Sequence, residues 1–268
     1  MAEGITVVAE RINGTRKRVG AALESRDAEL IKKEARAQAE AGATYIDVNA
    51  GVAGTDEVEG LLWLVETVQG EIDTPLCLDS ANPKALAAAL PKVKGSVIVN
   101  SINGDPERIE GILPLVAEHD AGVVALTMEE SRMPETVADR MKIAKVLAGE
   151  CQKAGVPMSR VYFDPCVLAA STSPGQPTAV LETVREIRKT WPDTHVISGL
   201  SNISFGLPKR SLLNCTYVPM MVACGADAFI LDPTDAAMRA TLAAVGVLSG
   251  ADDYGMEYIG AVRDGAVN

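Results

Sequence analysis

Four carboxylates stand at the ends of short apolar runs, where a buried strand should give way to a loop. They are Asp47, Asp79, Asp164 and Asp232, in YIDVNAG, LCLDSAN, VYFDPCV and FILDPTD. An ionised carboxylate only accepts hydrogen bonds. A group of them therefore suits either a divalent cation or a flat ligand with several N–H donors. Single Asp residues at such places commonly cap helices or shape turns, so their meaning depends on whether the four converge.

Further polar side chains follow the other apolar runs in the same way. They are Glu10, Arg11 and Asn13 after the first run, Asn49 after the second, Asn100 after the fourth and Asn202 after the seventh. The Asn side chain both donates and accepts hydrogen bonds. Such amides suit a ring edge on which donors and acceptors alternate.

Eight apolar runs with helical patterns between them predict the fold. The runs lie at 5–10, 44–49, 75–80, 96–101, 122–127, 160–165, 194–199 and 227–232. They lack strict alternation, which is typical of strands buried on both faces. Eight strand–helix units in 268 residues favour an α/β protein, a (β/α)8 TIM barrel in a single domain over residues 1–268. An open doubly wound sheet would show a glycine-rich first turn, and the sequence has none.

In such a barrel the carboxyl ends of all strands meet at one rim, so the polar residues above are expected to form one site. Pro83, Pro106 and Pro134 are expected in the first turns of three of the intervening helices.

The composition excludes several classes of function. A formal net charge of −11 opposes binding to nucleic acid or anionic membranes. No apolar run approaches the ~18 residues of a membrane helix, and no signal-peptide pattern begins the sequence. Five scattered cysteines without a CxxC spacing indicate reduced thiols and a cytoplasmic location. The only histidines, His119 and His195, are far apart, so no metal site built on a histidine cluster is expected.

Six stretches, ERINGT, DVNAG, LCLDSAN, VNSING, FDPCVL and GLSNIS, resemble in order and spacing the methyltetrahydrofolate:corrinoid methyltransferases. The resemblance covers roughly residues 4–250. That family shares its pterin-binding barrel with dihydropteroate synthase and with a module of cobalamin-dependent methionine synthase. The resemblance implies methyl transfer between N5 of tetrahydrofolate and the cobalt of a corrinoid. The chain lacks the Asp-x-His-x-x-Gly motif of base-off cobalamin sites, so the corrinoid is expected on a partner protein. A homodimer is also implied.

The resemblance assigns roles position by position. Asp79, Asn100 and Asp164 match the residues that hold the pyrimidine edge of the pterin, and Asn202 matches the catalytic residue that hydrogen-bonds near N5. The neighbouring positions of the substrate pocket are Glu10, Arg11, Asn13, Asp47, Asn49 and Arg210. The loop after the seventh run, NISFGLPKRSLLN, departs from the family pattern beyond Asn202.

Two other functions and one basic segment stay open at this stage. A dihydropteroate synthase-like enzyme would need a basic anion site at the last strand, where FILDPTD is acidic. A folate-binding subunit without catalysis is the other alternative. The segment NGTRKRVG at 13–20 carries Arg16, Lys17 and Arg18, and it can contact the folate tail, steer an acidic corrinoid protein, or be a solvated loop.

Overall fold

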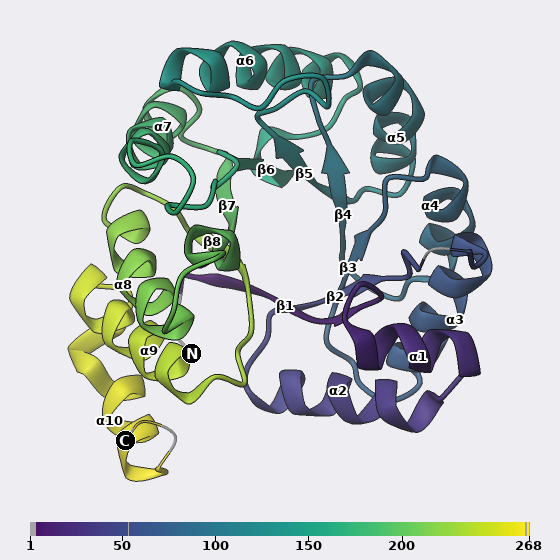
Figure 1. Ribbon diagram of the computed structural model, residues 1–268, viewed down its shortest axis with the longest axis horizontal. Coiled ribbons are helices and arrows are strands. Elements are labelled where there is room, and N and C mark those ends of the chain that lie inside the picture. The colour runs from purple at the N-terminus through teal and green to yellow at the C-terminus, as the bar shows by residue number, and fades with distance from the viewer. Residues whose placement is uncertain (1–3, 53, 266, 268) are drawn as a thin grey trace.

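The computed structural model describes residues 4–52, 54–265 and 267, and its centre is a closed barrel of eight parallel strands (Figure 1). The strands pair in chain order, and the last closes the ring by pairing with the first. They are β1 (Thr6–Asn13), β2 (Tyr45–Asn49), β3 (Leu76–Asp79), β4 (Val97–Ile102), β5 (Gly122–Leu126), β6 (Val161–Asp164), β7 (His195–Gly199) and β8 (Ala228–Leu231). Each strand overlaps one of the eight apolar runs, so the predicted (β/α)8 TIM barrel is confirmed.

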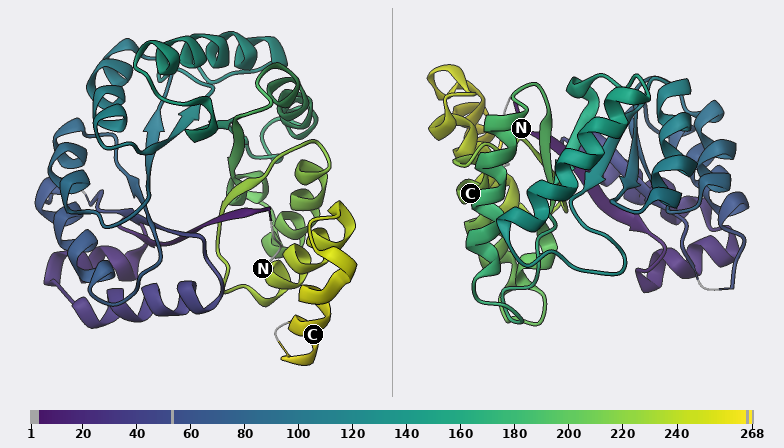
Figure 2. Two further views of the ribbon diagram at one scale, coloured as in Figure 1. Left: turned by 180° about the vertical axis from the view of Figure 1, so that it is seen from behind. Right: turned by 90° about the horizontal axis from the view of Figure 1, so that it is seen from above.

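Helices surround the strands as an outer layer (Figures 1 and 2). The α-helices are α1 (Lys17–Ser25), α2 (Ala28–Glu40), α3 (Glu57–Gln69), α4 (Pro83–Ala89), α5 (Pro106–Glu118), α6 (Val137–Lys153), α7 (Gln176–Thr190), α8 (Arg210–Val222), α9 (Ala236–Ser249) and α10 (Met256–Arg263). Short 3-10 turns are η1 (Leu90–Lys92), η2 (Met158–Arg160), η3 (Leu200–Ser204) and η4 (Asp253–Gly255). None of the described helices combines the length and apolar character needed to cross a membrane.

Local signals in the sequence set most helix starts. Pro83 and Pro106 occupy the first positions of α4 and α5, as predicted, because an N–H is not needed there. The prediction for Pro134 is wrong, since α6 begins only at Val137. The reason is a capping box, in which the Thr136 hydroxyl accepts from the Asp139 N–H and the Asp139 carboxylate accepts from the Thr136 N–H. This reciprocal pair satisfies two free N–H groups at the helix start.

Apolar side chains fill the inside of the barrel as well as the layer between strands and helices. The inner cluster contains one residue from each of seven strands: Val8, Cys77, Ile98, Val124, Tyr162, Ile197 and Ala228. At the amino end of the strands, the ring of Tyr162 stacks on His195 with centroids 4.5 Å apart. The packed interior therefore leaves the polar residues at the carboxyl ends as a separate layer.

The register of the strands brings several of these polar residues side by side. Asn13 pairs with Asn49 between β1 and β2, and Asp79 pairs with Asn100 between β3 and β4. Neighbouring strands lie about 4.8 Å apart, so such pairs can contact one ligand together.

Candidate active site

A cavity of about 530 Å³ opens at the carboxyl end of the barrel. Its wall is formed by Glu10, Asn13, Thr15, Arg16, Asp47, Asp79, Asn100, Ser201, Arg210, Ser211, Asn214, Ile230, Asp232 and Asp235. Six of the ten residues that the resemblance assigns to the site share this wall: Glu10, Asn13, Asp47, Asp79, Asn100 and Arg210. The strand-end carboxylate Asp232 lies there as well. Cavities of this volume commonly hold small organic ligands.

Asp47 is the most deeply buried acid on this wall. Asp47 is only 2% exposed, and its Oδ1 atom is buried without a hydrogen-bond partner. Burial, followed by the charge of Asp79, raises the pKa of Asp47 well above its ordinary value, while side-chain contacts of Cys77 and Asn100 act in the opposite direction. A buried polar atom without a partner is costly, so the cavity floor is arranged for a group that the protein itself does not supply.

We expect Asp47→Asn to raise the free energy of unfolding of the ligand-free protein, and the gain to grow with pH. Because the folded-state pKa of Asp47 is raised, its favourable contribution to stability is complete below the unfolded value of about 3.9 and is lost as the pH rises through the folded value. The amide keeps the size of the side chain without that loss. Urea unfolding should show a gain of at least about 1 kcal/mol at about pH 8 and less at about pH 5.

The exposed Asp253→Asn variant is the control for this experiment, because that residue lies in η4, away from the cavity wall. A gain from Asp47→Asn that is the same at both pH values would contradict the assignment of a buried acid with a raised pKa.

Asp79 and Asn100 end neighbouring strands and face the cavity together. Burial raises the pKa of Asp79, and a hydrogen bond with the Asn49 side chain offsets part of this rise. Asn49 itself does not belong to the wall. Its Oδ1 atom accepts from the Gly51 N–H at 2.8 Å, so the structure places Asn49 behind Asp79 as a support.

Two arginines, Arg16 and Arg210, lie on the cavity wall. Arg16 donates to Glu10 Oε1 at 3.2 Å, and Ser201 Oγ donates to the same oxygen at 2.9 Å. Arg210, the first residue of α8, donates to the Ser201 carbonyl at 2.6 Å. Burial raises the pKa of Glu10, and Ser201, Arg16 and Arg210 oppose that shift. The wall thus carries acids from the strand ends and from the segment after β8, together with two arginines from the starts of α1 and α8.

Asp164 and Asn202 lie beside this wall and not on it. Asp164 accepts from the Cys166 N–H at 2.7 Å and from the Gly199 N–H at 3.3 Å, and burial raises its pKa to about 6. Asn202, in η3, is exposed and donates from Nδ2 to the Val167 carbonyl at 2.6 Å. Asn202 follows Ser201 of the wall directly, and Asp164 accepts from Gly199, two residues before Ser201, so Asp164 and Asn202 lie close to the wall on the β6–β7 side.

Arg11, also predicted as a site residue, does not lie on the cavity wall. Its guanidinium donates to Glu34 of α2 at 2.7 Å, to Asp232 at 3.2 Å and to Thr234 Oγ1 at 2.8 Å. It therefore joins β1, α2 and the loop after β8. The structure shows it as a brace behind Asp232, which does lie on the wall.

Several wall residues carry no signal in the sequence. Ser211, Asn214 and Asp235 come from α8 and from the loop before α9, and Ser211 donates to Asp235 at 2.7 Å. Only the packing of α8 against α9 decides which face of each helix start reaches the rim. Ser201 could have been found, because it precedes Asn202 in GLSNIS.

Within the described residues, no three His, Cys, Asp or Glu side chains form a group that could hold a metal ion. The acids of the wall are spread over several strands instead. Of the two ligand types that a set of carboxylates suits, this spacing favours an organic ligand with N–H donors.

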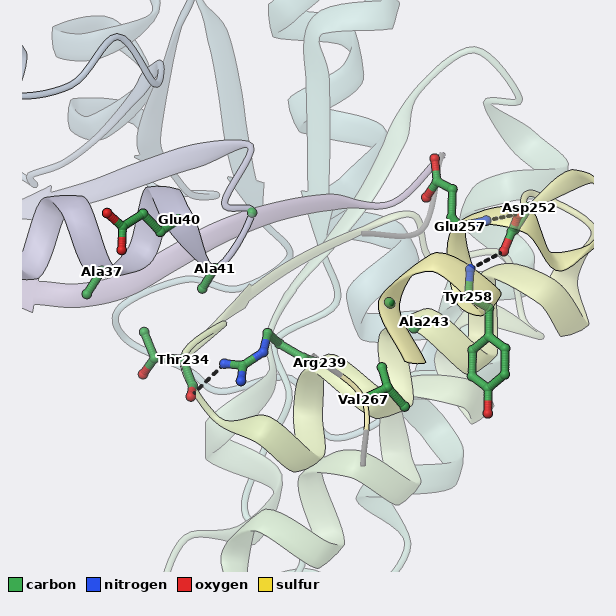
Figure 3. Close-up of a pocket in the computed structure, with 12 residues that line it drawn as sticks. Ala37, Glu40, Ala41, Thr234, Arg239, Ala243, Asp252, Glu257, Tyr258 and Val267 are labelled. Atoms are coloured by element: carbon green, nitrogen blue, oxygen red, sulfur yellow. Dashed lines mark hydrogen bonds between the residues drawn. The ribbon is translucent and has the colours of Figure 1, made fainter. Parts of the chain in front are cut away.

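A second hollow, of about 520 Å³, lies on the flank of the barrel between α2 and the α9–α10 pair (Figure 3). Small side chains such as Ala37 and Ala243 form much of it. Arg239 donates to the Thr234 carbonyl at 2.9 Å, and Asp252 accepts from the Tyr258 N–H at 2.9 Å. These two charged side chains thus form hydrogen bonds with backbone groups, whereas strand-end acids such as Asp79 line the cavity at the rim.

Comparison with known proteins shows the family to which this chain belongs. The sequence model of the pterin-binding enzymes matches residues 9–232. The methylcorrinoid:tetrahydrofolate methyltransferase of Eubacterium limosum is 38% identical over 263 residues, which cover 97% of each chain. The methionine synthase of Mycobacterium tuberculosis is 30% identical over 240 residues, or 85% of this chain and 20% of that protein. This chain therefore spans about a fifth of that relative.

Solved structures with the same fold include two dihydropteroate synthases. The enzyme from Thermus thermophilus has a TM-score of 0.66 and 20% identity, with 92% of this chain and 94% of that chain covered. The enzyme from Yersinia pestis has a TM-score of 0.64 and 16% identity, with 81% and 88% covered. Likeness at such identities shows the shared fold alone. The family match and the relative that is similar over 97% of both chains decide the assignment. This chain belongs to the pterin-binding enzymes, and within them to the family of the methylcorrinoid:tetrahydrofolate methyltransferases.

Proposed function

We propose that this protein transfers a methyl group between N5 of tetrahydrofolate and the cobalt of a corrinoid held by a partner protein. The similarity to a methylcorrinoid:tetrahydrofolate methyltransferase over 97% of both chains carries the reaction class. The geometry that supports it is the pairing of Asp79 with Asn100 above the buried Asp47, on one wall.

The polarity of the cavity supports one orientation of the folate. A pterin ring carries N–H donors on its pyrimidine edge, and the acids and amides at the strand ends can accept them. The glutamate tail of the folate is anionic, and Arg16 and Arg210 are the cations on the wall. The pterin edge therefore enters first, between Asp79 and Asn100 on one side and Asp164 on the other, and the tail remains near the two arginines.

This orientation turns N5 toward the β6–β7 side of the rim, where we place the catalytic role of Asn202. A nitrogen that loses a methyl group develops negative charge, and a donor amide stabilises that charge. Asn202 Nδ2 already donates to Val167, and an amide NH2 group has a second hydrogen to offer. Glu10 and Asp47, whose pKa values are raised by burial, are the wall residues suited to hold a proton for N5.

The corrinoid supplies the cobalt that accepts or donates the methyl group when its carrier protein is bound. The chain supplies position and electrostatics. The dihydropteroate synthase reaction has a pyrophosphate leaving group and would need cations near β8. The structure instead places Asp232 and Asp235 there on the cavity wall.

The decisive experiment is a turnover assay with methylcobalamin and tetrahydrofolate, followed by the absorbance of the corrinoid and by chromatography of 5-methyltetrahydrofolate. We expect methyl transfer to tetrahydrofolate, and transfer in reverse to reduced cobalamin. Folate binding without transfer in either direction would favour the non-catalytic subunit, and absence of folate binding would reject the pterin site.

The basic segment at 13–20 is not a loop throughout, because α1 begins at Lys17. Lys17 and Arg18 are exposed in the first helical turn, where the helix dipole disfavours cations. Arg16 differs from them, since it lies on the cavity wall. We propose that Arg16 serves the folate tail, and that Lys17 and Arg18 attract the corrinoid protein.

We expect the double variant Lys17→Glu and Arg18→Glu to slow transfer to a protein-bound corrinoid about tenfold at low salt, because exposed charges steer association. Added salt should shrink the difference, and transfer to free cobalamin should stay unchanged. Arg16→Glu, the comparison variant, should slow transfer to both acceptors. Equal slowing of both acceptors by the double variant would argue against a docking role.

We also propose a homodimer. Exposed apolar side chains gather on α8, α9 and the following segment, among them Leu212 at 63%, Leu248 at 86% and Met256 at 65% exposure. The opposite face of α8, with Tyr217 and Met221, is buried against the barrel. A second copy is the partner we propose for this surface, since symmetric dimers are the commonest assemblies.

Light scattering should give twice the chain mass for the wild type and a lower mass for Leu248→Glu, which places a charge in the proposed interface. A wild-type mass equal to one chain at every concentration would reject the dimer. We further propose that residues 1–268 act as one domain in the cytoplasm. The free thiols of all five cysteines agree with a reducing compartment.

A further inference from the structure

The largest fully buried side chain of the described protein is a cation, Arg140 of α6. Its residue is 0% exposed, and none of the ion pairs within the described residues involves it. An unpaired buried charge is expensive. An apolar residue of similar size would fill this space at a lower cost in folding free energy. The charge and the hydrogen bonds of Arg140 therefore point to a role beyond packing.

Within the described residues, the hydrogen bonds of the Arg140 guanidinium all go to neutral oxygens. Nε donates to the Pro165 carbonyl at 2.6 Å, and Nη2 donates to the Cys166 carbonyl at 3.4 Å and to Gln176 Oε1 at 2.6 Å. Nη1 donates to the Thr136 carbonyl at 3.4 Å. Arg140 therefore ties the start of α6 to the segment that follows β6.

The segment after β6 is hydrogen-bonded to both Asp164 and Asn202. The Cys166 N–H donates to Asp164, and the Val167 carbonyl accepts from Asn202. Cys166 has a φ of 56°, a backbone conformation that a residue with a side chain seldom adopts. A tight turn of this kind keeps its shape when its carbonyls are held, and Arg140 holds two consecutive ones.

The charge of Arg140 acts on Asp164 as well. Burial raises the pKa of Asp164 to about 6, and Arg140 lowers it together with the N–H groups of Cys166 and Gly199. The other titratable groups around this pair are Cys166 and Tyr217, both with a pKa raised by burial, and Asp139, half-buried at the start of α6. Arg140 is the cation among them, so it supports the negative charge of Asp164.

We propose that Arg140 is a positioning residue for the pterin: it holds the 165–167 turn that aims Asp164 and Asn202, and its buried charge favours the anionic form of Asp164. The inference rests on the proposed function, because Asp164 and Asn202 are taken as pterin contacts. Arg140 itself does not belong to the cavity wall.

The test is the pH dependence of 5-methyltetrahydrofolate affinity in Arg140→Met, which keeps much of the length of the side chain without its charge. Wild-type affinity should fall on the acid side of about pH 6, where Asp164 takes up a proton. In Arg140→Met this midpoint should rise by about one pH unit, which lowers the affinity about tenfold on the acid side. Glu10, Asp47 and Asp79 also titrate in the cavity, so the same substitution is measured in an Asp164→Asn background. There the shift should vanish.

Two more variants separate the charge of Arg140 from its hydrogen bonds. Arg140→Lys keeps the charge but cannot reach several carbonyls, so it should slow single-turnover methyl transfer with little change in the midpoint. Gln176→Glu places an anion against an intact Arg140 and should raise the midpoint as Arg140→Met does. It also serves in place of Arg140→Met should that variant not fold.

Arg188→Met is the matched control. Arg188 of α7 also donates to backbone carbonyls, Gly225 at 2.6 Å among them, but at the amino ends of β7 and β8. It should lower stability and leave the midpoint unchanged. The inference is overturned if both charge-cancelling variants keep the wild-type midpoint, if the shift persists with Asp164→Asn, or if Arg188→Met reproduces it. A wild-type protein that does not bind the folate would instead reject the proposed function.

Discussion

We expect Asn202→Ala to transfer the methyl group about 100-fold more slowly than the wild type, the typical effect of removing one donor to developing charge. The folded protein should change little. Asn202 is exposed, and its side chain makes one hydrogen bond, to the Val167 carbonyl. The loss of such a bond costs about 1 kcal/mol. A large change in rate beside a small change in stability distinguishes a catalytic amide from a turn residue.

The rate is measured in single turnover with reduced cobalamin, and the stability by thermal unfolding. Ser171→Ala is a suitable control, since its hydroxyl donates to the Phe205 carbonyl at 2.8 Å and ties down the same segment without bordering N5. Transfer at the wild-type rate in Asn202→Ala would leave this residue with a structural role only.

Asp79→Ala should weaken the binding of 5-methyltetrahydrofolate by about 1–3 kcal/mol, because it leaves N–H donors of the pterin without an acceptor. Asp164→Ala should act similarly from the other side of the ring. The loss should appear in the affinity, since the pterin edge is distant from the bond that breaks. Asn100, beside Asp79, remains in place and keeps part of the affinity.

Titration calorimetry at neutral pH measures the effect. Asp73→Ala is the control: it removes an exposed carboxylate just before β3, at the opposite end of that strand. Wild-type affinity in both Asp79→Ala and Asp164→Ala would rule out the assignment of the pterin edge to these acids.

The strands of the barrel were predictable because their signal is local. A strand buried on both faces is a short apolar run, and the run ends where side chains become polar. Each of the eight runs became a strand, and Asp79 and Asp164 indeed stand at the last positions of β3 and β6. The acids of the candidate site were visible for the same reason, since the carboxyl ends of the barrel strands form the rim.

The direction of each side chain was not visible. Strict alternation along β1 would put residues 10 and 12 on one face and residues 11 and 13 on the other. The register shifts between Ala9 and Ile12, and as a result Glu10 and Asn13 both reach the cavity while Ile12 is in the core. Arg11 turns instead to Glu34 and Asp232.

The sequence by itself therefore determined the eightfold strand–helix order, the rim as the place of the site and the acidic character of its wall, because these depend on residues adjacent in the chain. Only the tertiary structure decided that Asn49 supports Asp79, that Arg16 reaches the cavity from the start of α1, and that Arg140 is buried behind Asp164. These relations join residues far apart in the chain, and they form only when strands set their register and helices pack around them.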